Sequence, residues 1–172
     1  MCFNTQQDKT TFTMGRTLRD RIKQTRPFES AAQEAMLNLF VASAHARQRI
    51  ESACREHDLQ FSHYNVLRIL RGAHPEGHPR CEIIERMIDP SPDVTRLMDK
   101  LVERGLVRRS RSQEDRRMRI HTITEDGIDV LDAMHPAIQE VQEWFGRRVS
   151  DRDLNHLSRI CEGIYASSEG EG

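Results

Sequence analysis

The chain has 172 residues, of which 37% are hydrophobic, 31% charged and 5% aromatic. This length can bury a core without metals or disulfides, and the scarcity of aromatic residues disfavours sandwiches and barrels and favours a helical protein. The net charge of −1 means that total charge does not indicate a nucleic-acid partner, so the distribution of charge has to be considered instead.

The first 27 residues are polar and weakly patterned, and they predict a tail or short arm. Six basic residues and two acids in residues 1–26 leave a net charge of 6 − 2 = +4, for which a solvated charged face is the favoured interpretation. Ser30 is a good N-cap residue. It predicts a helix from residue 30 to about 56, with apolar residues at helical spacing at Leu37, Phe40, Val41 and Ala44.

A second and a third helix are predicted on either side of a loop. The second begins at Ser62 as N-cap and ends at Gly72, with an apolar stripe formed by Val66, Leu67, Ile69 and Leu70. The sequence HPEGHP at 74–79 predicts a loop. The third helix is short, spanning about 80–88, and its expected buried residues are Ile83, Ile84, Met87 and Ile88.

The fourth helix has the clearest boundary signals in the sequence. Ser91 is the expected N-cap, Pro92 the first helical residue and Gly105 the left-handed stop. The expected core face consists of Val94, Leu97, Met98, Leu101 and Val102. The opposite face then carries Asp93, Thr95, Arg96, Asp99, Lys100 and Glu103.

A two-stranded hairpin with a long basic tip is predicted after this helix. Its strands lie at about 106–109 and 118–123. Seven arginines between 104 and 119, against Glu114 and Asp115, give a net charge of 7 − 2 = +5. Such a local excess of positive charge suits a phosphate-binding surface.

Two more helices complete the chain. Thr124 is expected to cap the fifth, whose near-heptad seam is formed by Ile128, Leu131, Met134, Ile138, Val141 and Phe145. Pro136 should bend this helix or leave one carbonyl unpaired. Ser150 is expected to cap the last helix, 151–165, and residues 166–172 form a tail.

A helix, a short helix, a further helix and a basic hairpin occur in the order of a winged helix-turn-helix, whose recognition helix enters the DNA major groove. Arg96 can bond bidentately to guanine, Thr95 can contact a thymine methyl or a phosphate, and Lys100 is better placed for the backbone. The remaining candidates on this helix are Ser91, Asp93 and Asp99. The two acids could hold Arg96 or Lys100, or accept from cytosine. An ordinary amphipathic surface helix is the alternative.

The predicted hairpin strengthens the DNA-binding interpretation. Arginines at its tip, at positions 111, 116 and 117, can enter the narrow and electronegative minor groove. Asp115 is expected to anchor the tip and orient an arginine. The alternative is a solvated basic hairpin without a partner.

Three segments resemble the MarR family of winged helix-turn-helix regulators. These are DVTRLMDKLVERGLVRR at 93–109, EDRR at 114–117 and ITEDG at 123–127. Two features depart from the family pattern: Ile123 replaces the usual leucine, and two prolines, at 90 and 92, lie in the helix-turn-helix turn.

The resemblance implies a mostly α fold with a small β-hairpin wing, made of a winged helix-turn-helix lobe and a helical dimerisation lobe. The domain would span 28–165, with the DNA-binding lobe at 59–124 and dimerisation helices at 28–57 and 125–165. It further implies a homodimer on a palindromic operator in double-stranded DNA, acting as a repressor that a small molecule or another signal releases.

Sensing by a thiol or a metal is the main alternative for the signal. Cys54 and Cys81 could respond to oxidants, but buried or inert thiols are favoured because the four cysteines form no CxxC pair. Cys2 does not match the sensing position of oxidant-responsive members. His74, His78 and Cys81 have a spacing that could hold a metal, although a turn is the better interpretation, so we expect no metal.

The sequence assigns no effector-binding residues. His45, Trp144 and Phe145 could line a ligand cleft, but core packing is favoured for them. No Gly-rich phosphate loop, nucleophile elbow or paired-carboxylate pocket is visible, so neither an enzyme nor a cofactor is expected. A polar N-terminus and the lack of a long apolar run predict a cytoplasmic protein without a signal peptide or membrane contact. A winged-helix module that binds protein and not DNA stays as a further alternative.

Overall fold

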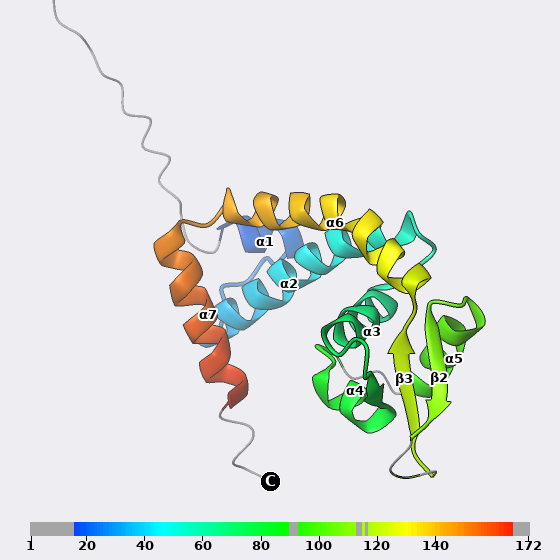
Figure 1. Cartoon of the computed structure of the whole chain (residues 1–172). Helices are drawn as coiled ribbons and strands as arrows, with labels where there is room; N and C mark the ends of the chain where they lie inside the picture. The colour runs from blue at the N-terminus through cyan, green and yellow to red at the C-terminus, as the bar shows by residue number, and fades with distance from the viewer. Residues whose placement is uncertain (1–15, 90–92, 113–114, 116, 167–172) are drawn as a thin grey trace, which may run out of the picture. The chain divides into compact units, whose positions relative to one another are not determined.

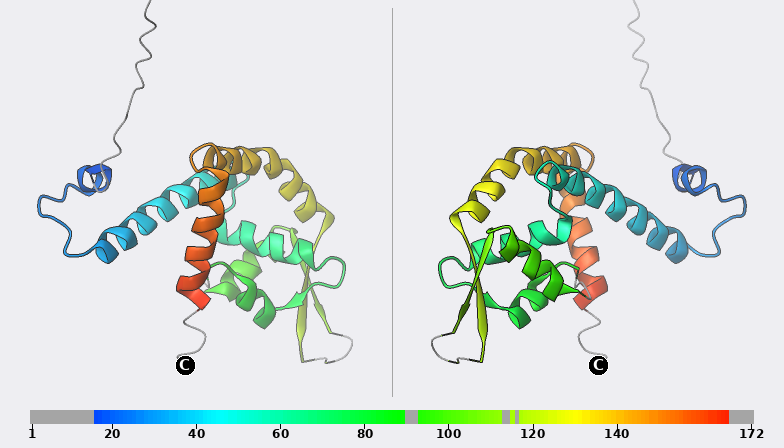
Figure 2. Two further views of the ribbon diagram at one scale, coloured as in Figure 1. Left: turned by 90° about the vertical axis from the view of Figure 1, so that its left-hand side faces the viewer. Right: turned by 90° about the vertical axis from the view of Figure 1, so that its right-hand side faces the viewer.

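The computed structural model describes residues 16–89, 93–112, 115 and 117–166. The chain forms two compact units, residues 1–45 and 46–172, and each is described here by itself. Figures 1 and 2 show the helices and the small sheet of the second unit. None of the helices in the described part of the chain combines the length and apolar character needed to cross a bilayer.

The first unit contains helix α1 (Arg16–Ile22) and the beginning of α2 (Ala31–Arg55), which continues into the second unit. The prediction for α2 is confirmed, and Ser30 Oγ accepts a hydrogen bond from the Gln33 N–H at 3.1 Å. Helix α1 was not expected, because the segment was assigned to a tail. Its seven residues make only about two turns, too few for an apolar periodicity to be recognised.

Helices α3 (Phe61–Gly72), α4 (Arg80–Arg86) and α5 (Val94–Glu103) surround the core of the second unit. The expected caps of α3 and α5 were wrong. The N-cap of α3 is Gln60, not Ser62. The N-cap of α5 is Asp93, whose carboxylate accepts from the Arg96 N–H at 3.3 Å. Ser91, the expected cap of α5, lies outside the described residues together with Pro92.

The expected apolar faces of these helices are largely confirmed. Buried side chains come from α3 (Val66, Leu67, Leu70), α4 (Ile83) and α5 (Val94, Leu97, Met98, Leu101). Ile69, Ile84 and Val102 are partly buried against the same core. Ile88 is 64% exposed, because α4 ends at Arg86 and the chain continues past the buried Met87 without helical spacing. One continuous core therefore fixes the inner face of α5 and leaves its other face in solvent.

The sheet has three antiparallel strands, not the two that were predicted. Strands β2 (Val107–Arg111) and β3 (Arg119–Ile123) form the hairpin, and β1 (His78–Pro79) pairs with the other edge of β3. The predicted loop at 74–79 therefore ends in a short strand. Gly77 makes this possible, because its φ of +75° and its lack of a Cβ allow its backbone to approach the carbonyl of His121.

Helix α6 (Glu125–Gly146) begins at Thr124, the predicted cap, whose Oγ1 accepts from the Gly127 N–H at 3.1 Å. The seam prediction holds for Leu131, Met134 and Ile138, which are buried. Pro136 lies inside the helix as expected. Helix α7 (Asp151–Ala166) follows its predicted cap Ser150, and none of its described residues is buried.

Candidate nucleic-acid interface

Helix α5 presents a polar face that is exposed along its whole length. The side chains of Asp93, Thr95, Arg96, Asp99 and Lys100 are all exposed, as expected from the spacing of the apolar residues. A helix with a hydrophobic inner face and exposed short or forked polar side chains can enter the major groove, where base edges are read by hydrogen bonds.

Two of these side chains are held by neighbouring elements. Thr95 Oγ1 accepts a hydrogen bond from Arg80 Nη1 of α4 at 2.6 Å. Asp99 Oδ1 lies 2.9 Å from Arg109 Nη1 of β2. The sequence offered Arg96, Lys100 or a cytosine as the partner of Asp99, and within the protein the structure pairs it with Arg109 instead. Asp99 thereby connects the helix to the wing.

The tip of the β2–β3 hairpin is organised around Asp115. Its Oδ1 accepts from the Arg117 N–H at 2.8 Å, and its carbonyl accepts from the Met118 N–H at 2.9 Å. The Asp115 N–H in turn donates to Ser112 Oγ at 3.3 Å. These contacts suit the predicted anchoring role, with Arg111 and Arg117 exposed beside the anchor. Arg116 lies outside the described residues.

Sequence reasoning missed the contacts that position the recognition helix. At its C-terminal end, the guanidinium of Arg104 donates to the carbonyls of Asp58 at 2.6 Å and His57 at 3.0 Å. Before its N-terminal end, the buried Asn65 accepts from the Ile88 N–H at 2.9 Å. The only sequence signal was an asparagine among the apolar residues of α3, which is uncommon in a core without a partner.

Two histidines are buried beneath this surface and were not expected there. Burial lowers the pKa of His63, and the nearby charges of Lys100 and Arg104 lower it further. Burial also lowers the pKa of His121, with Arg109 as the next cause. Both rings are therefore neutral near pH 7. His121 Nδ1 is buried and has no hydrogen-bond partner among the described residues.

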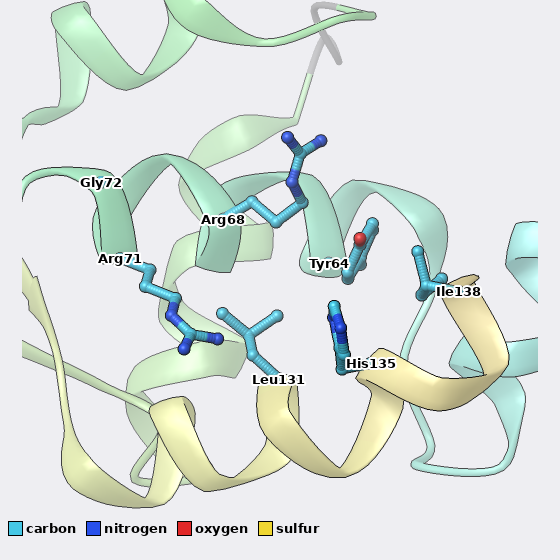
Figure 3. A pocket seen from close by; sticks show the side chains of 7 residues that line it. All are labelled: Tyr64, Arg68, Arg71, Gly72, Leu131, His135 and Ile138. Atoms are coloured by element: carbon cyan, nitrogen blue, oxygen red, sulfur yellow. The ribbon is translucent and has the colours of Figure 1, made fainter. Parts of the chain in front are cut away.

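A pocket of about 320 Å³ lies between α3 and α6. Figure 3 shows Tyr64 of α3 and His135 of α6 reaching into the space between the two helices, next to Leu131 and Ile138. Burial raises the pKa of the Tyr64 phenol. The lining is therefore mixed, with two apolar side chains among several polar ones, and convergent polar groups in a concave site can orient a small molecule.

Two arginines of α3 lie at the edge of this pocket. Arg71 forms an ion pair with Asp132 of α6 at 2.7 Å, and the guanidinium of Arg68 lies 5.8 Å from the centre of the Tyr64 ring. The ion pair joins the two helices beside the pocket. A ligand placed between α3 and α6 would therefore act directly on the connection between these elements.

Cys54, Cys81 and His78, the candidates for sensing by a thiol or a metal, differ in their burial and in their contacts. Cys54 is fully buried, and burial raises the pKa of its thiol to about 11, so it is inert near pH 7. Cys81 is exposed. His78 Nδ1 lies 3.0 Å from Glu82 Oε2 within α4 and its preceding strand, so this histidine already has a carboxylate partner.

Trp144 and Phe145 of α6, the candidates for a ligand cleft, have cationic and aromatic neighbours. The Trp144 ring has the guanidinium of Arg49 at 4.1 Å and that of Arg148 at 4.7 Å from its centre. Phe145 is tilted against Trp144, with 6.4 Å between the ring centres. Both side chains are half-buried and neither belongs to the buried core, so they form cation–π and aromatic contacts and not the core packing that was favoured for them.

The fold and the comparisons together define a winged helix-turn-helix transcriptional regulator. The family model for the transcriptional regulator SarA/Rot matches residues 48–134, half of the chain. The HTH-type transcriptional regulator MhqR of Bacillus subtilis is 30% identical over 107 residues, which cover 60% of this chain and 72% of MhqR. The chain belongs to the MarR/SarA family of regulators.

Solved structures agree with this assignment. A MarR transcription factor from Planctomyces limnophilus has 32% identity and a TM-score of 0.59, with 84% of this chain and all of that chain covered. MepR of S. aureus, solved in complex with DNA, has 17% identity and a TM-score of 0.68, covering 75% of this chain and 94% of MepR. The likeness to MepR concerns the fold.

Proposed function

We propose that this regulator binds operator DNA through α5 and the β2–β3 wing. The observation that carries the proposal is the exposed polar face of α5 next to a hairpin whose tip is built around Asp115 and bears exposed arginines. Phosphate contacts set the position of a protein on DNA, whereas base-edge contacts set its sequence preference. The residues proposed to form this DNA-binding surface are Ser91, Asp93, Thr95, Arg96, Asp99, Lys100, Arg111, Arg116 and Arg117.

The internal contacts of α5 divide these residues into two roles. Thr95 and Asp99 are held by Arg80 and Arg109, so we assign them to orienting the surface. Arg96 and Lys100 are exposed and lie on the same face. Arg96 is therefore the proposed reader of a base edge and Lys100 a phosphate contact.

A homodimer on a palindromic operator completes the proposal. Helix α7 has no buried residue among those described, yet Leu157, Ile160 and Ile164 give it apolar side chains that are 36%, 55% and 59% exposed. A run of exposed apolar side chains on an amphipathic helix marks an interface. We propose that α7 contributes to a two-fold interface, which would place two wings on two half-sites.

The pocket between α3 and α6 is the proposed effector site. Leu131 and Ile138 beside the arginines of α3 suit a small organic molecule with a polar or anionic group. Because the Arg71–Asp132 ion pair joins the two helices there, occupancy would shift α3 against α6 and release DNA. We infer a non-catalytic protein that acts in the cytoplasm, where DNA is accessible.

Two substitutions on the same surface test the proposal. Arg96→Ala should relax the preference at one base pair by about 1–3 kcal/mol, whereas Arg117→Ala should weaken binding to most sequences alike. The measurement is a binding competition with DNA fragments selected from genomic DNA and with single-base variants of them. If both variants bind the selected fragment as the unaltered protein does, the proposed surface is wrong.

A further inference from the structure

A second pocket, of about 380 Å³, lies where α4, α5 and the β2–β3 wing meet, with α5 beside β2 (Figure 1). Thr95 and Asp99 of α5 and Arg109 and Arg119 of the wing are among its lining residues. In duplex DNA a sugar–phosphate backbone separates the major groove from the adjacent minor groove. A protein that places a helix in one groove and the neighbouring hairpin in the other therefore has phosphates between these two elements. On the proposed DNA surface, the phosphates pass over this pocket.

Arg80 reaches the same pocket from a third element. It is the first residue of α4, it is exposed, and it belongs to the lining. The backbone around it is fixed on both sides, because Pro79 pairs with Ile120 of β3 and Ile83 of α4 is fully buried in the core. The base of the Arg80 side chain therefore has a defined position, as a residue that meets a ligand requires.

A hydrogen bond to α5 holds the other end of the Arg80 side chain. Arg80 Nη1 donates to Thr95 Oγ1 at 2.6 Å. A guanidinium carries five N–H donors in one plane, so a single bond to a neutral hydroxyl leaves its charge and most of its donors available. The planar fork of donors matches the oxygens of a phosphate group. Thr95 thereby fixes the direction in which Arg80 presents these donors.

The charge of Arg80 is available, whereas that of the neighbouring Arg109 is compensated. Arg109 forms an ion pair with Asp99 at 2.9 Å. Among the residues that the structure describes, no carboxylate lies within ion-pair distance of Arg80. Arg80 therefore brings a whole positive charge to the pocket, and a phosphate is the anion that the proposed surface places there.

We propose that Arg80 is a further DNA-binding residue, which donates to a phosphate of the strand between α5 and the wing, and that Thr95 positions it. Phosphate contacts set the register of a protein on the duplex and carry no direct base information. Arg80 therefore contributes affinity and fixes the depth and angle at which α5 lies in the major groove, whereas the base preference stays with α5 itself.

This inference rests on the proposed function and extends it to α4, an element that contributes no residue to the surface proposed above. It also gives Thr95 a definite task. A threonine that only covers the helix surface can be replaced by valine at little cost to DNA affinity. A threonine that orients an arginine cannot, because valine has the same shape and lacks the hydroxyl that accepts from Arg80 Nη1.

The experiment measures binding of the full chain to a fragment selected from genomic DNA, by fluorescence anisotropy at several salt concentrations. The variants are Arg80→Met, Arg80→Lys, Thr95→Val and the double variant of Arg80→Met with Thr95→Val. Arg108→Met is the matched control, because it removes the same charge from an exposed arginine of β2 that is outside the pocket lining and points to the opposite face of the strand from Arg109. Urea denaturation verifies that each variant is folded.

Arg80→Met should weaken binding about tenfold, equally for the fragment and its single-base variants, and should make the salt slope shallower by about 0.9, the loss of one phosphate contact. Arg80→Lys retains the charge without the planar fork, so it should keep the slope and recover part of the affinity. Thr95→Val should weaken binding by itself, and adding Arg80→Met to it should cost clearly less than Arg80→Met alone.

Two results overturn the contact by Arg80: an Arg80→Met protein with the affinity and salt slope of Arg108→Met, or a loss confined to one base pair. Losses from Arg80→Met and Thr95→Val that simply add would overturn the positioning role of Thr95. If Arg117→Ala weakens binding and Arg80→Met does not, this inference fails and the proposed function stands. If the unaltered protein retains no DNA fragment, both fail.

Discussion

Arg104 shows how one side chain fixes the recognition helix. It is the C-cap residue of α5, and its guanidinium holds two carbonyls of the turn between α2 and α3. Asp58, one of the two acceptors, has a φ of +54°, an uncommon conformation for this residue type. The hydrogen bonds therefore stabilise a turn that the backbone alone would not favour.

We expect Arg104→Met to lower the free energy of unfolding by about 1 kcal/mol, because two hydrogen bonds from a charged donor are lost at an exposed site. Urea denaturation measures the change. Arg108→Met, which removes an exposed arginine from β2, is the control and should change stability by no more than about 0.5 kcal/mol. Equal losses in both variants would contradict the role of Arg104.

The buried histidines make stability depend on pH. Burial lowers the pKa of His63 and of His121 below the ordinary value of 6.5. Well above pH 6.5 both the folded and the unfolded chain carry neutral rings. As the pH falls through 6.5, the unfolded chain binds protons that the folded chain does not, so the free energy of unfolding decreases.

His121→Gln should reduce the dependence of the free energy of unfolding on pH, because one of the two buried titrating rings is removed. Each histidine contributes a slope of up to about 1.4 kcal/mol per pH unit in this window. Denaturation at several pH values between about 7.5 and 5.5 gives the slope for the unaltered protein and for the variant. An identical slope in both would show that His121 stays accessible to protons in the folded state.

At the scale of elements, the apolar periodicity of α5 and α6 predicted their buried faces, because one side of each helix packs on a continuous core. The N-caps of α3 and α5 were misplaced because several neighbouring residues have capping side chains and only the backbone conformation selects one. Strand β1 was missed since two residues carry no alternation. The pairing of β1 with β3 depends on the close approach of Gly77 to β3. This is a tertiary contact, so a local sequence pattern does not show it.

Gly127 joins the first turn of α6 to the sheet. A Cβ at this position would overlap the Leu106 carbonyl and lie 2.7 Å from Ile123 Cγ1. We expect Gly127→Ala to destabilise the protein by about 1–3 kcal/mol, because both neighbours are held in the core. Gly146, at the other end of the helix, has nothing within 4 Å of such a Cβ.

Gly146→Ala is therefore the matched control for Gly127→Ala. It should leave stability unchanged or raise it by up to about 1 kcal/mol, the difference in helix propensity between the two residues. Thermal unfolding of both variants compares them directly. A Gly127→Ala protein as stable as the unaltered chain would mean that α6 can move away from Leu106 without loss.

At the scale of the whole molecule, the sequence predicted the winged helix-turn-helix and the family, because the order of the elements and three motifs are local features. The pocket lined by Cys81, Asp99 and His121 was not predictable, since these residues lie on three elements and meet only in the fold. The partner of Asp99 was missed for the same reason. Charges within one helix were visible in the sequence, whereas Arg109 on β2 was brought near only by the sheet.

The proposed dimer gives a prediction at the scale of the whole molecule, about the oligomeric state of the protein. Ile160→Asp and Ile164→Asp together place charge on the exposed apolar side chains of α7, which should dissociate the dimer and weaken operator binding. Analytical ultracentrifugation measures the mass in solution. Arg152→Asp, a charge change on the same helix at an exposed position, is the control. A variant that stays dimeric would exclude these α7 residues from the interface.

The measurement that tests the central claim most directly is the salt dependence of binding to a selected operator fragment. Neutralising phosphates with arginine and lysine releases counterions, so the logarithm of the association constant should fall linearly with the logarithm of salt concentration, with a slope of about −0.9 per phosphate contact. The Arg117→Ala protein should show a shallower slope, by about one unit. Binding that does not change with salt, or a genomic selection that retains no fragment, would contradict DNA recognition by α5 and the wing.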